Sequence, residues 1–197
     1  IQQLNDGNYE EAISAFDLAL QEGDGRVGDM ELDILKYRAE AEYKAGDYAA
    51  ASHTWDILLE VDEKQPEYLY ARSIAKAGEG NFQEALADYE EAAALEFQMN
   101  REVSGRGEAL MAVGKALENA GQADQAASLY EKALEEGIGE DSAQVWNALA
   151  LSLMENGNYE EALQYLERGI SLGDNGFMPT LLYNQAVAYE YMSQYEK

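Results

Sequence analysis

The sequence predicts an all-α fold, an α-solenoid built from antiparallel helix pairs. A short turn motif recurs along the chain, segments with helical spacing of apolar residues flank each copy, and only two of the 197 residues are proline. The hexapeptide GNYEEA at 7–12 recurs letter for letter at 157–162. Weaker copies lie between the two, and a fixed period of roughly 20–50 residues is typical of a repeat architecture.

Each turn motif has a glycine, an aromatic residue two positions later and an alanine three positions beyond that. The copies are Gly7-Tyr9-Ala12, Gly46-Tyr48-Ala51, Gly80-Phe82-Ala85, the weaker Gly121-Ala123-Ala126, Gly157-Tyr159-Ala162, and an incomplete Ser193-Gln194-Tyr195. Their aromatic positions are separated by 39, 34, 41, 36 and 36 residues. Because glycine readily adopts the left-handed backbone that ends a helix, each turn is predicted to join two antiparallel helices.

The helix after each turn carries an alanine followed four residues later by a large side chain. The pairs are Ala12 and Phe16, Ala51 and Trp55, Ala85 and Tyr89, Ala126 and Tyr130, and Ala162 and Leu166. Residues four apart share one helix face, so the alanine lets a neighbouring helix approach closely while the large side chain fills the adjacent space. These pairs predict the packing face of each second helix.

The helix before each turn has its own apolar pattern. It is clearest at Trp146, Leu149, Ala150 and Leu153, and it recurs at Leu110, Val113, Gly114 and Leu117. Pro66 and Pro179 stand where first helices are expected to begin, a position that tolerates proline because the missing N–H would be unpaired there. The segment 96–105 lacks the glycine cluster of other connections, and we expect it to lengthen a second helix.

Together these motifs resemble the tetratricopeptide repeat (TPR) family, whose pattern is Trp-x-x-Leu-Gly-x-x-Tyr, then Ala-x-x-x-Phe, then Pro over about 34 residues. The resemblance implies a right-handed TPR-like superhelix, and residues 1–197 are predicted to form a single solenoid domain. Its expected repeats are 1–28 (partial), 29–64, 65–104, 105–141, 142–177 and 178–197 (partial). Because both ends fall inside a repeat, we expect a piece of a longer protein.

Two repeats depart from the family pattern at positions that are normally apolar. Arg38 and Arg72 replace the leucine of the first helix, and Glu42 and Lys76 replace its tyrosine. Long charged side chains can bury their apolar stems while their charged heads stay in water. We therefore expect partly buried stems with charged tips at these positions.

Charge and composition restrict the possible partners. The chain has 39 acidic and 13 basic residues, a formal net charge of −26, and no cysteine. This field repels nucleic acid and anionic lipid and attracts basic partners. No apolar run is long enough to span a bilayer, so direct membrane insertion is not expected. The compartment stays open between the cytoplasm and, after loss of a signal or lipid-anchor segment, an extracytoplasmic location; a bacterial source suits the family.

No motif predicts catalysis, a cofactor or a bound metal. The single histidine, His53, has no second histidine or cysteine to build a metal site or triad with, and is expected on the surface. Asp24 and Asp29 lie in a glycine-rich loop that lacks the ligand spacing of an EF-hand, so turn and capping roles are favoured over calcium binding.

The predicted binding surface is the concave side, which first helices line in a helix-pair solenoid. Positions one residue beyond the core stripe of each first helix should point there. The candidates are Lys36, Tyr43, Tyr70, Ile74, Met111, Lys115, Asn147, Leu151, Met154, Tyr183 and Val187. Tyrosine, methionine and aliphatic residues suit a peptide- or helix-binding groove. The alternative is that neighbouring first helices bury Ile74, Leu151 and Val187.

The predicted function is a non-catalytic protein-interaction scaffold that binds a peptide or helix of a basic, partly apolar partner. The TPR clamp for carboxylate-terminated peptides is not expected, because Glu40 and Glu67 would repel that carboxylate. Two alternatives remain: a targeting or regulatory TPR arm of a larger enzyme, and a module that self-assembles through its open repeat ends.

Overall fold

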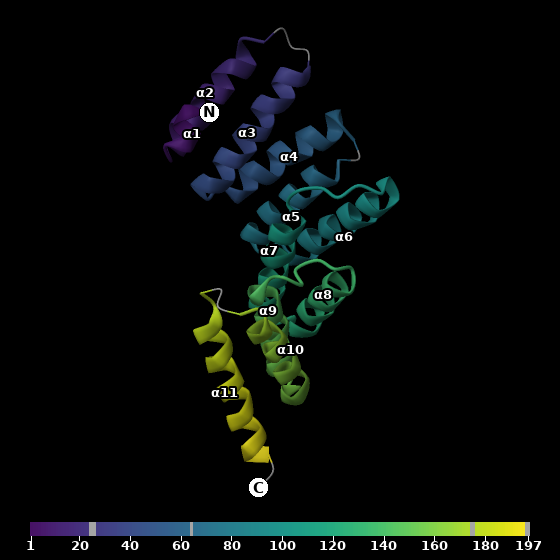
Figure 1. Cartoon of the computed structure of the whole chain (residues 1–197). Coiled ribbons are helices and arrows are strands. Elements are labelled where there is room, and N and C mark those ends of the chain that lie inside the picture. Colours follow the sequence, from purple (N-terminus) through teal and green to yellow (C-terminus); the bar gives the residue numbers. More distant parts are fainter. Residues whose placement is uncertain (24–26, 64, 174–175, 196–197) are drawn as a thin grey trace. The chain divides into compact units, whose positions relative to one another are not determined.

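A computed structural model describes residues 1–23, 27–63, 65–173 and 176–195 (Figure 1). Within these ranges the regular elements are helices and no strand occurs. The helices are α1 (Gln2–Asn5), α2 (Tyr9–Gln21), α3 (Asp29–Ala45), α4 (Tyr48–Val61), α5 (Pro66–Glu79), α6 (Phe82–Met99), α7 (Arg106–Asn119), α8 (Ala123–Glu135), α9 (Ala143–Glu155), α10 (Tyr159–Ser171) and α11 (Met178–Tyr195). The predicted all-α class is confirmed.

The chain divides into two compact units, residues 1–112 (unit 1) and residues 113–197 (unit 2), with the boundary inside α7. Unit 1 contains α1 to α6 and the first half of α7, and unit 2 contains the rest of α7 and α8 to α11. The arrangement of all residues in one solenoid domain, with the repeat boundaries given above, stays a prediction.

The five turn motifs that contain glycine join helices as predicted, whereas the incomplete motif at 193–195 lies within α11 and its prediction as a turn is wrong. The turn between α3 and α4 shows how the glycine motifs work. Gly46 has φ 83°, in the left-handed region that favours glycine. Its N–H donates to the Tyr43 carbonyl at 3.0 Å, and the Asp47 N–H donates to the Glu42 carbonyl at 2.9 Å. The Asp47 carboxylate then accepts the Ala50 N–H at 3.1 Å and caps α4. These bonds satisfy the end of one helix and the start of the next.

Proline and the long connection also behave as predicted. Pro66 is the first residue of α5, and Pro179 is the second residue of α11. The 18-residue helix α6 extends into the segment without a glycine cluster and ends at Met99, where Asn100 adopts φ 47°.

Unit 1 buries the alanines and large residues that follow its turns. Ala12 and Phe16 pack with Leu4 and Ala41 in one cluster, while Leu35, Leu58 and Tyr68 form another. Consecutive helices from α2 to α6 contact one another. The spacing of alanine and large residues therefore marks the packing face correctly, although Trp55 is only half-buried.

The unusual arginines of unit 1 connect its helices through carboxylates. On α3, the Arg38 guanidinium binds Asp17 of α2 at 2.7 Å and Glu42 at 2.8 Å, and it also donates to the Thr54 hydroxyl of α4. Thr54 in turn donates to Glu42 at 2.7 Å. Because Glu42 is buried, this pairing offsets the cost of removing its charge from water.

Arg72 repeats the arrangement one helix pair later. From α5, its guanidinium binds Asp56 of α4 at 2.7 Å and the buried Asp88 of α6 through bonds of 2.8 and 2.7 Å. Lys76 lies 3.1 Å from the same Asp88. Arg38, Arg72 and Lys76 are partly buried stems with charged tips, as expected, whereas the whole side chain of Glu42 is buried, so the expectation is wrong there. The two guanidinium groups link each first helix to the second helices on both sides.

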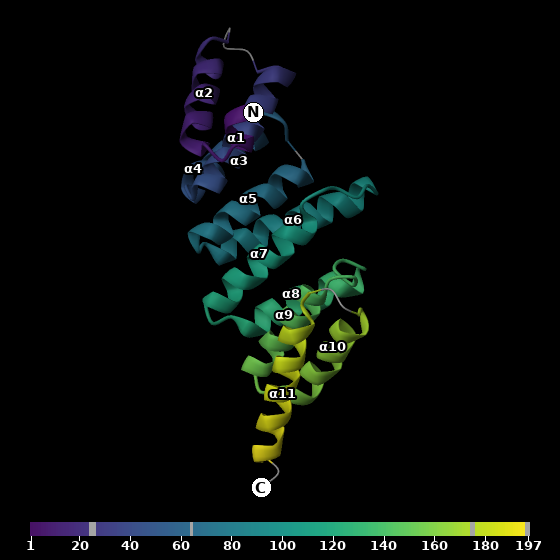
Figure 2. The same cartoon turned by 60° about the vertical axis from the view of Figure 1, so that its left-hand side comes forward.

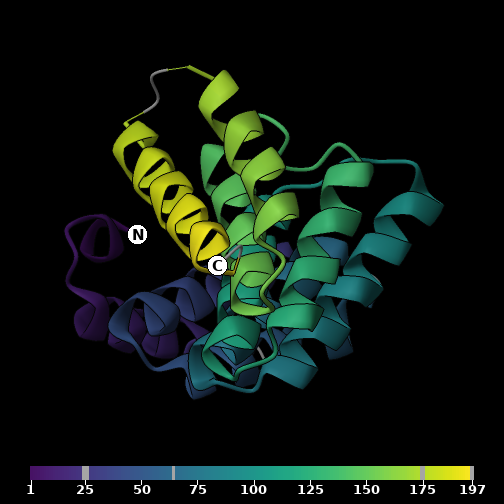
Figure 3. The same ribbon diagram turned by 90° about the horizontal axis from the view of Figure 1, so that it is seen from below.

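Unit 2 has a more apolar core. Its fully buried large residues include Tyr130, Leu149, Leu166 and Leu181. In the part of α7 that belongs to this unit, Gly114 faces Tyr130 so closely that a Cβ there would lie 2.1 Å from the tyrosine oxygen. Helix α11 contacts both α9 and α10, as two further views show (Figures 2 and 3).

Candidate functional site

The described residues contain no group of three or more histidine, cysteine, aspartate and glutamate side chains that could hold a metal ion. Nor does any helix among them have the length and apolar character needed to cross a membrane. His53 is exposed, as predicted. Asp24 lies outside the described residues, and Asp29 is the first residue of α3.

Lys36 and Tyr43, the first two residues predicted to contact a partner, already have contacts within unit 1. Lys36 is half-buried, lies 3.3 Å from the Asp33 carboxylate and stands 5.5 Å from the centre of the Tyr68 ring. Tyr43 is exposed and packs at a tilt against Tyr48, with ring centres 5.4 Å apart. Lys36 is therefore engaged internally, whereas part of Tyr43 remains accessible.

The prediction of Tyr70 as a partner contact is wrong. Its side chain is fully buried, and its hydroxyl donates to the Glu96 carboxylate at 2.7 Å. Burial, reinforced by the hydrogen bond to Glu96, raises the pKa of Tyr70. Glu96 also accepts the Val103 N–H at 2.9 Å and pairs with Arg106 at 3.3 Å. Tyr70 thus anchors the connection after α6, while Ile74 and Met111 are half-buried.

Asn147 is also misplaced by the sequence analysis. It is buried, and its side-chain oxygen accepts a 2.7 Å hydrogen bond from the amide nitrogen of buried Asn184. This bond joins α9 to α11, so it satisfies two polar groups that would otherwise be costly to bury. Asn147 therefore has a packing role between neighbouring first helices.

The remaining candidates of unit 2 have accessible side chains on three successive first helices. Leu151, Met154 and Val187 are half-buried, Lys115 is exposed, and Tyr183 is 69% exposed. Helix α9 contacts α11, and the Ser152 hydroxyl of α9 donates to Glu118 of α7 at 3.2 Å. We call these five residues the first-helix surface: Lys115, Leu151, Met154, Tyr183 and Val187.

A partly buried acid lies next to this surface. The Glu118 carboxylate accepts hydrogen bonds from the Tyr130 hydroxyl at 3.3 Å and the Ser152 hydroxyl at 3.2 Å. Burial raises the pKa of Glu118, nearby Glu155 raises it further, and the two hydroxyl donors and Lys115 oppose the rise. Within the described chain no cation forms an ion pair with Glu118, in contrast to the buried acids of unit 1.

A separate pocket in unit 2 was not predicted from the sequence. It has a volume of about 440 Å³ and is lined by Glu140, Trp146, Tyr165, Arg168, Ser171 and Leu172. The apolar pattern predicts Trp146 in the core stripe of its helix, but the indole is half-buried and stacks on Tyr165, with ring centres 5.9 Å apart. The sequence did carry one signal for this pocket. Tyr165 directly precedes the core residue Leu166, so its ring had to lie outside the predicted core face of the helix.

The antiparallel helix pairs, left-handed glycine turns and alanine contacts define a helical-repeat protein of the α-solenoid class. A family model described as tetratricopeptide repeat matches residues 38–101 and 107–176, more than half of the chain. The chain belongs to the tetratricopeptide repeat family. No curated protein sequence matches it significantly.

Solved structures show the same fold at low sequence identity. A crystal structure of MamA superposes with a TM-score of 0.69 at 18% identity, covering 87% of this chain and 86% of that one. YrrB, a TPR protein with an unusual peptide-binding site, gives a TM-score of 0.63 at 19% identity, covering 92% and 85%. The C-terminal part of a TPR repeat-containing protein from Cytophaga hutchinsonii gives 0.74 at 17% identity, covering 99% and 70%.

Proposed function

We propose that the chain is a non-catalytic protein-interaction scaffold that holds a peptide or helix of a partner in a concave groove lined by its first helices. The observation that carries this proposal is the first-helix surface of unit 2. Leu151, Met154 and Val187 keep part of their apolar surface accessible, although the opposite faces of the same helices are buried. Membership of the TPR family and the peptide-binding site of the similar YrrB support the same reading.

The chemistry of this surface suits an apolar anchor with polar flanks. Full burial of an aliphatic or methionine side chain contributes about 1.5–3 kcal/mol before the cost of association. Three such side chains that are already half-buried would contribute part of that range each, less than the roughly 8 kcal/mol of a micromolar complex, so micromolar affinity also requires hydrogen bonds or charge contacts with the partner. Exposed Tyr183 adds a ring with a polar tip, a residue type enriched at interfaces.

The charge of the chain favours a basic partner. A net charge of −26 accelerates encounters with cationic peptides and weakens binding to anionic ones. Since this attraction acts partly through solvent, affinity for a basic peptide should fall as ionic strength rises.

The test is selection of binders from a random peptide library, followed by affinity measurement with paired variants. Leu151→Asp combined with Met154→Asp is expected to lower the affinity for the selected peptides at least tenfold, because two charges replace two apolar contacts. The matched control is Gln125→Asp with Ser128→Asp, which adds the same charge at exposed positions of α8. The control should bind almost as tightly as the original chain.

Circular dichroism of both variants separates lost binding from lost structure. If the Leu151 and Met154 variant keeps its helical content and binds as tightly as the control, the first-helix surface is not the binding site and the proposal fails.

A further inference from the structure

The pocket at Trp146 is lined by two aromatic rings, an acid, Glu140, and a cation, Arg168. The indole and phenol rings stack with centres 5.9 Å apart and planes 19° apart. The Trp146 indole N–H donates to the Glu140 carbonyl at 2.9 Å, so its polar edge is already satisfied. The exposed Glu140 carboxylate has no ion pair within the described chain. The pocket therefore offers ring surface and a carboxylate without an ion pair, in a lining that also includes the cation Arg168.

Unit 1 contains a comparable aromatic pair with its cation in place. Trp55 and Tyr68 pack with ring centres 5.7 Å apart, and Lys36 stands 5.5 Å from the centre of the Tyr68 ring. Attraction between a cation and the face of an aromatic ring stabilises this arrangement. Among the described residues no lysine or arginine occupies the same place over Trp146 or Tyr165. A cation thus stands over the Trp55–Tyr68 pair, whereas none is found over the Trp146–Tyr165 pair among the described residues.

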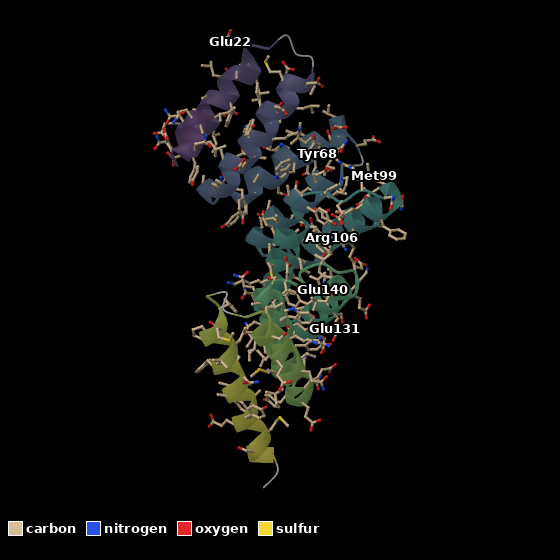
Figure 4. All side chains as sticks on the ribbon, viewed as in Figure 1. Glu22, Tyr68, Met99, Arg106, Glu131 and Glu140 are labelled. Atoms are coloured by element: carbon tan, nitrogen blue, oxygen red, sulfur yellow. The ribbon has the colours of Figure 1, made fainter. Side chains whose placement is uncertain are left out.

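The surroundings of the open pair are acidic. Burial raises the pKa of Tyr165, and the charges of Glu131, Glu161 and Glu135 raise it further. Figure 4 marks Glu131 and Glu140 in unit 2. The pocket also includes Ser171 and Leu172 at the carboxyl end of α10, where the helix dipole favours positive charge.

We propose that this pocket binds the guanidinium group of an arginine side chain from a partner protein, stacked on an outer face of the Trp146–Tyr165 ring pair and paired with Glu140. A planar guanidinium stacks on aromatic faces and can donate two hydrogen bonds to one carboxylate. The site goes beyond the proposed function, because none of its residues belongs to the first-helix surface. It supplies a second, charge-selective contact.

Arg168 allows a test of whether the pocket binds a cation or an anion. Its side chain lines the pocket and forms no ion pair within the described chain. Its positive charge opposes a bound cation and would assist a bound anion. Removing this charge should therefore strengthen the binding of an arginine side chain.

The experiment follows the two indole N–H signals of the whole chain by NMR during titration with short peptides. The probe is acetyl-Gly-Arg-Gly-amide, and its neutral control carries citrulline, which has nearly the same shape. The arginine peptide should shift the Trp146 signal with millimolar affinity while the Trp55 signal stays in place, and the citrulline peptide should bind at least about twofold more weakly.

Three variants sharpen the result. Glu140→Gln and Tyr165→Leu should each lower the affinity for the arginine peptide about two- to fivefold, and Arg168→Gln should raise this affinity by a similar factor. Glu140 and Arg168 are exposed, so their variants should fold even if Tyr165→Leu does not. The Leu151→Asp and Met154→Asp variant should bind this peptide normally, which separates the two sites.

Equal shifts with arginine and citrulline would overturn the proposal. So would weaker binding of the arginine peptide to Arg168→Gln, or tighter binding of acetyl-Gly-Glu-Gly-amide than of the arginine peptide, since both results indicate an anion site.

Discussion

The two units differ in how they use their few cations. Every lysine and arginine that the structure describes in unit 1 is ion-paired: Lys36, Arg38, Lys44, Arg72, Lys76, Arg101 and Arg106. In unit 2 none of the described cations, Lys115, Lys132 and Arg168, forms an ion pair with a described residue. The described cations of unit 1 pair with acids of the same unit, whereas those of unit 2 are exposed and form no ion pair with a described residue.

Buried polar groups follow the same division. In unit 1 the buried carboxylates of Glu42, Asp88 and Glu96 each meet an arginine. Unit 2 instead buries asparagine against asparagine and gives Glu118 only hydroxyl donors. One family pattern thus supports two kinds of core, one that buries ion pairs and one that buries apolar residues and an asparagine pair.

The largest expected effect tests the ionic core of unit 1. Arg72→Ala should destabilise the chain by about 3 kcal/mol, because it leaves the buried Asp88 with Lys76 alone and removes the ion pairs of Arg72 that join α5 to α4 and α6. Urea unfolding measures the loss, and hydrogen exchange should place it in α4 to α6.

Arg168→Ala is the matched control in unit 2, with an expected change below about 0.5 kcal/mol. If both substitutions cost the same, the contrast between paired and free cations does not describe the stability of the chain.

The apolar core of unit 2 predicts the second effect. Gly114→Ala should cost about 2 kcal/mol, because the added Cβ would overlap the Tyr130 side chain at 2.1 Å. Thermal unfolding followed by circular dichroism measures it. Gly107→Ala, on the same helix with no atom within 4 Å of the added Cβ, should be neutral or slightly stabilising. A similar loss in both would mean that the helix, not the contact, is sensitive.

The smallest expected effect on stability concerns Glu118, the partly buried acid of unit 2 that has no ion pair within the described chain. Because the pKa of Glu118 is raised in the folded protein, the folded state holds its proton more tightly than the unfolded state does. The resulting stabilisation is present at low pH and is lost as pH rises through the folded-state pKa. Glu118→Gln keeps an oxygen for Tyr130 and Ser152 and should be slightly more stable than the original chain at pH 7.

That advantage should shrink as pH falls and Glu118 becomes protonated. Unfolding measured from pH 4 to pH 8 checks it, and a constant difference across the range would contradict the role of ionisation. In unit 1 the pKa of Glu42 is also raised, by burial and against the opposing Thr54 hydroxyl and Arg38, so Glu42→Gln should show the same pH trend although it removes the ion pair with Arg38.

Local patterns in the sequence predicted the helices and turns well. Glycine at a left-handed position and alanine at a close contact are requirements of one short segment, and Gly46 and Ala51 meet them as expected. The same reasoning failed for Tyr70 and Asn147. Their positions follow from partners 26 and 37 residues away, Glu96 and Asn184, which the spacing within one helix does not reveal.

The pocket at Trp146 escaped prediction for a related reason. Its rings come from α9 and α10, and Glu140 comes from the connection before α9. Trp146 occupies a position that the family pattern assigns to the core, so only the tertiary structure shows that the indole remains half-buried against Tyr165.

The most direct measurement is methyl NMR of the whole chain titrated with a peptide from the library selection. Methyl signals of Leu151, Met154 and Val187 should shift on binding, while those of Ile138 in the α8–α9 connection and Leu163 on α10 should stay in place. Shifts at Ile138 and Leu163 with none on the first-helix surface would contradict the central claim that the first helices carry the partner-binding site.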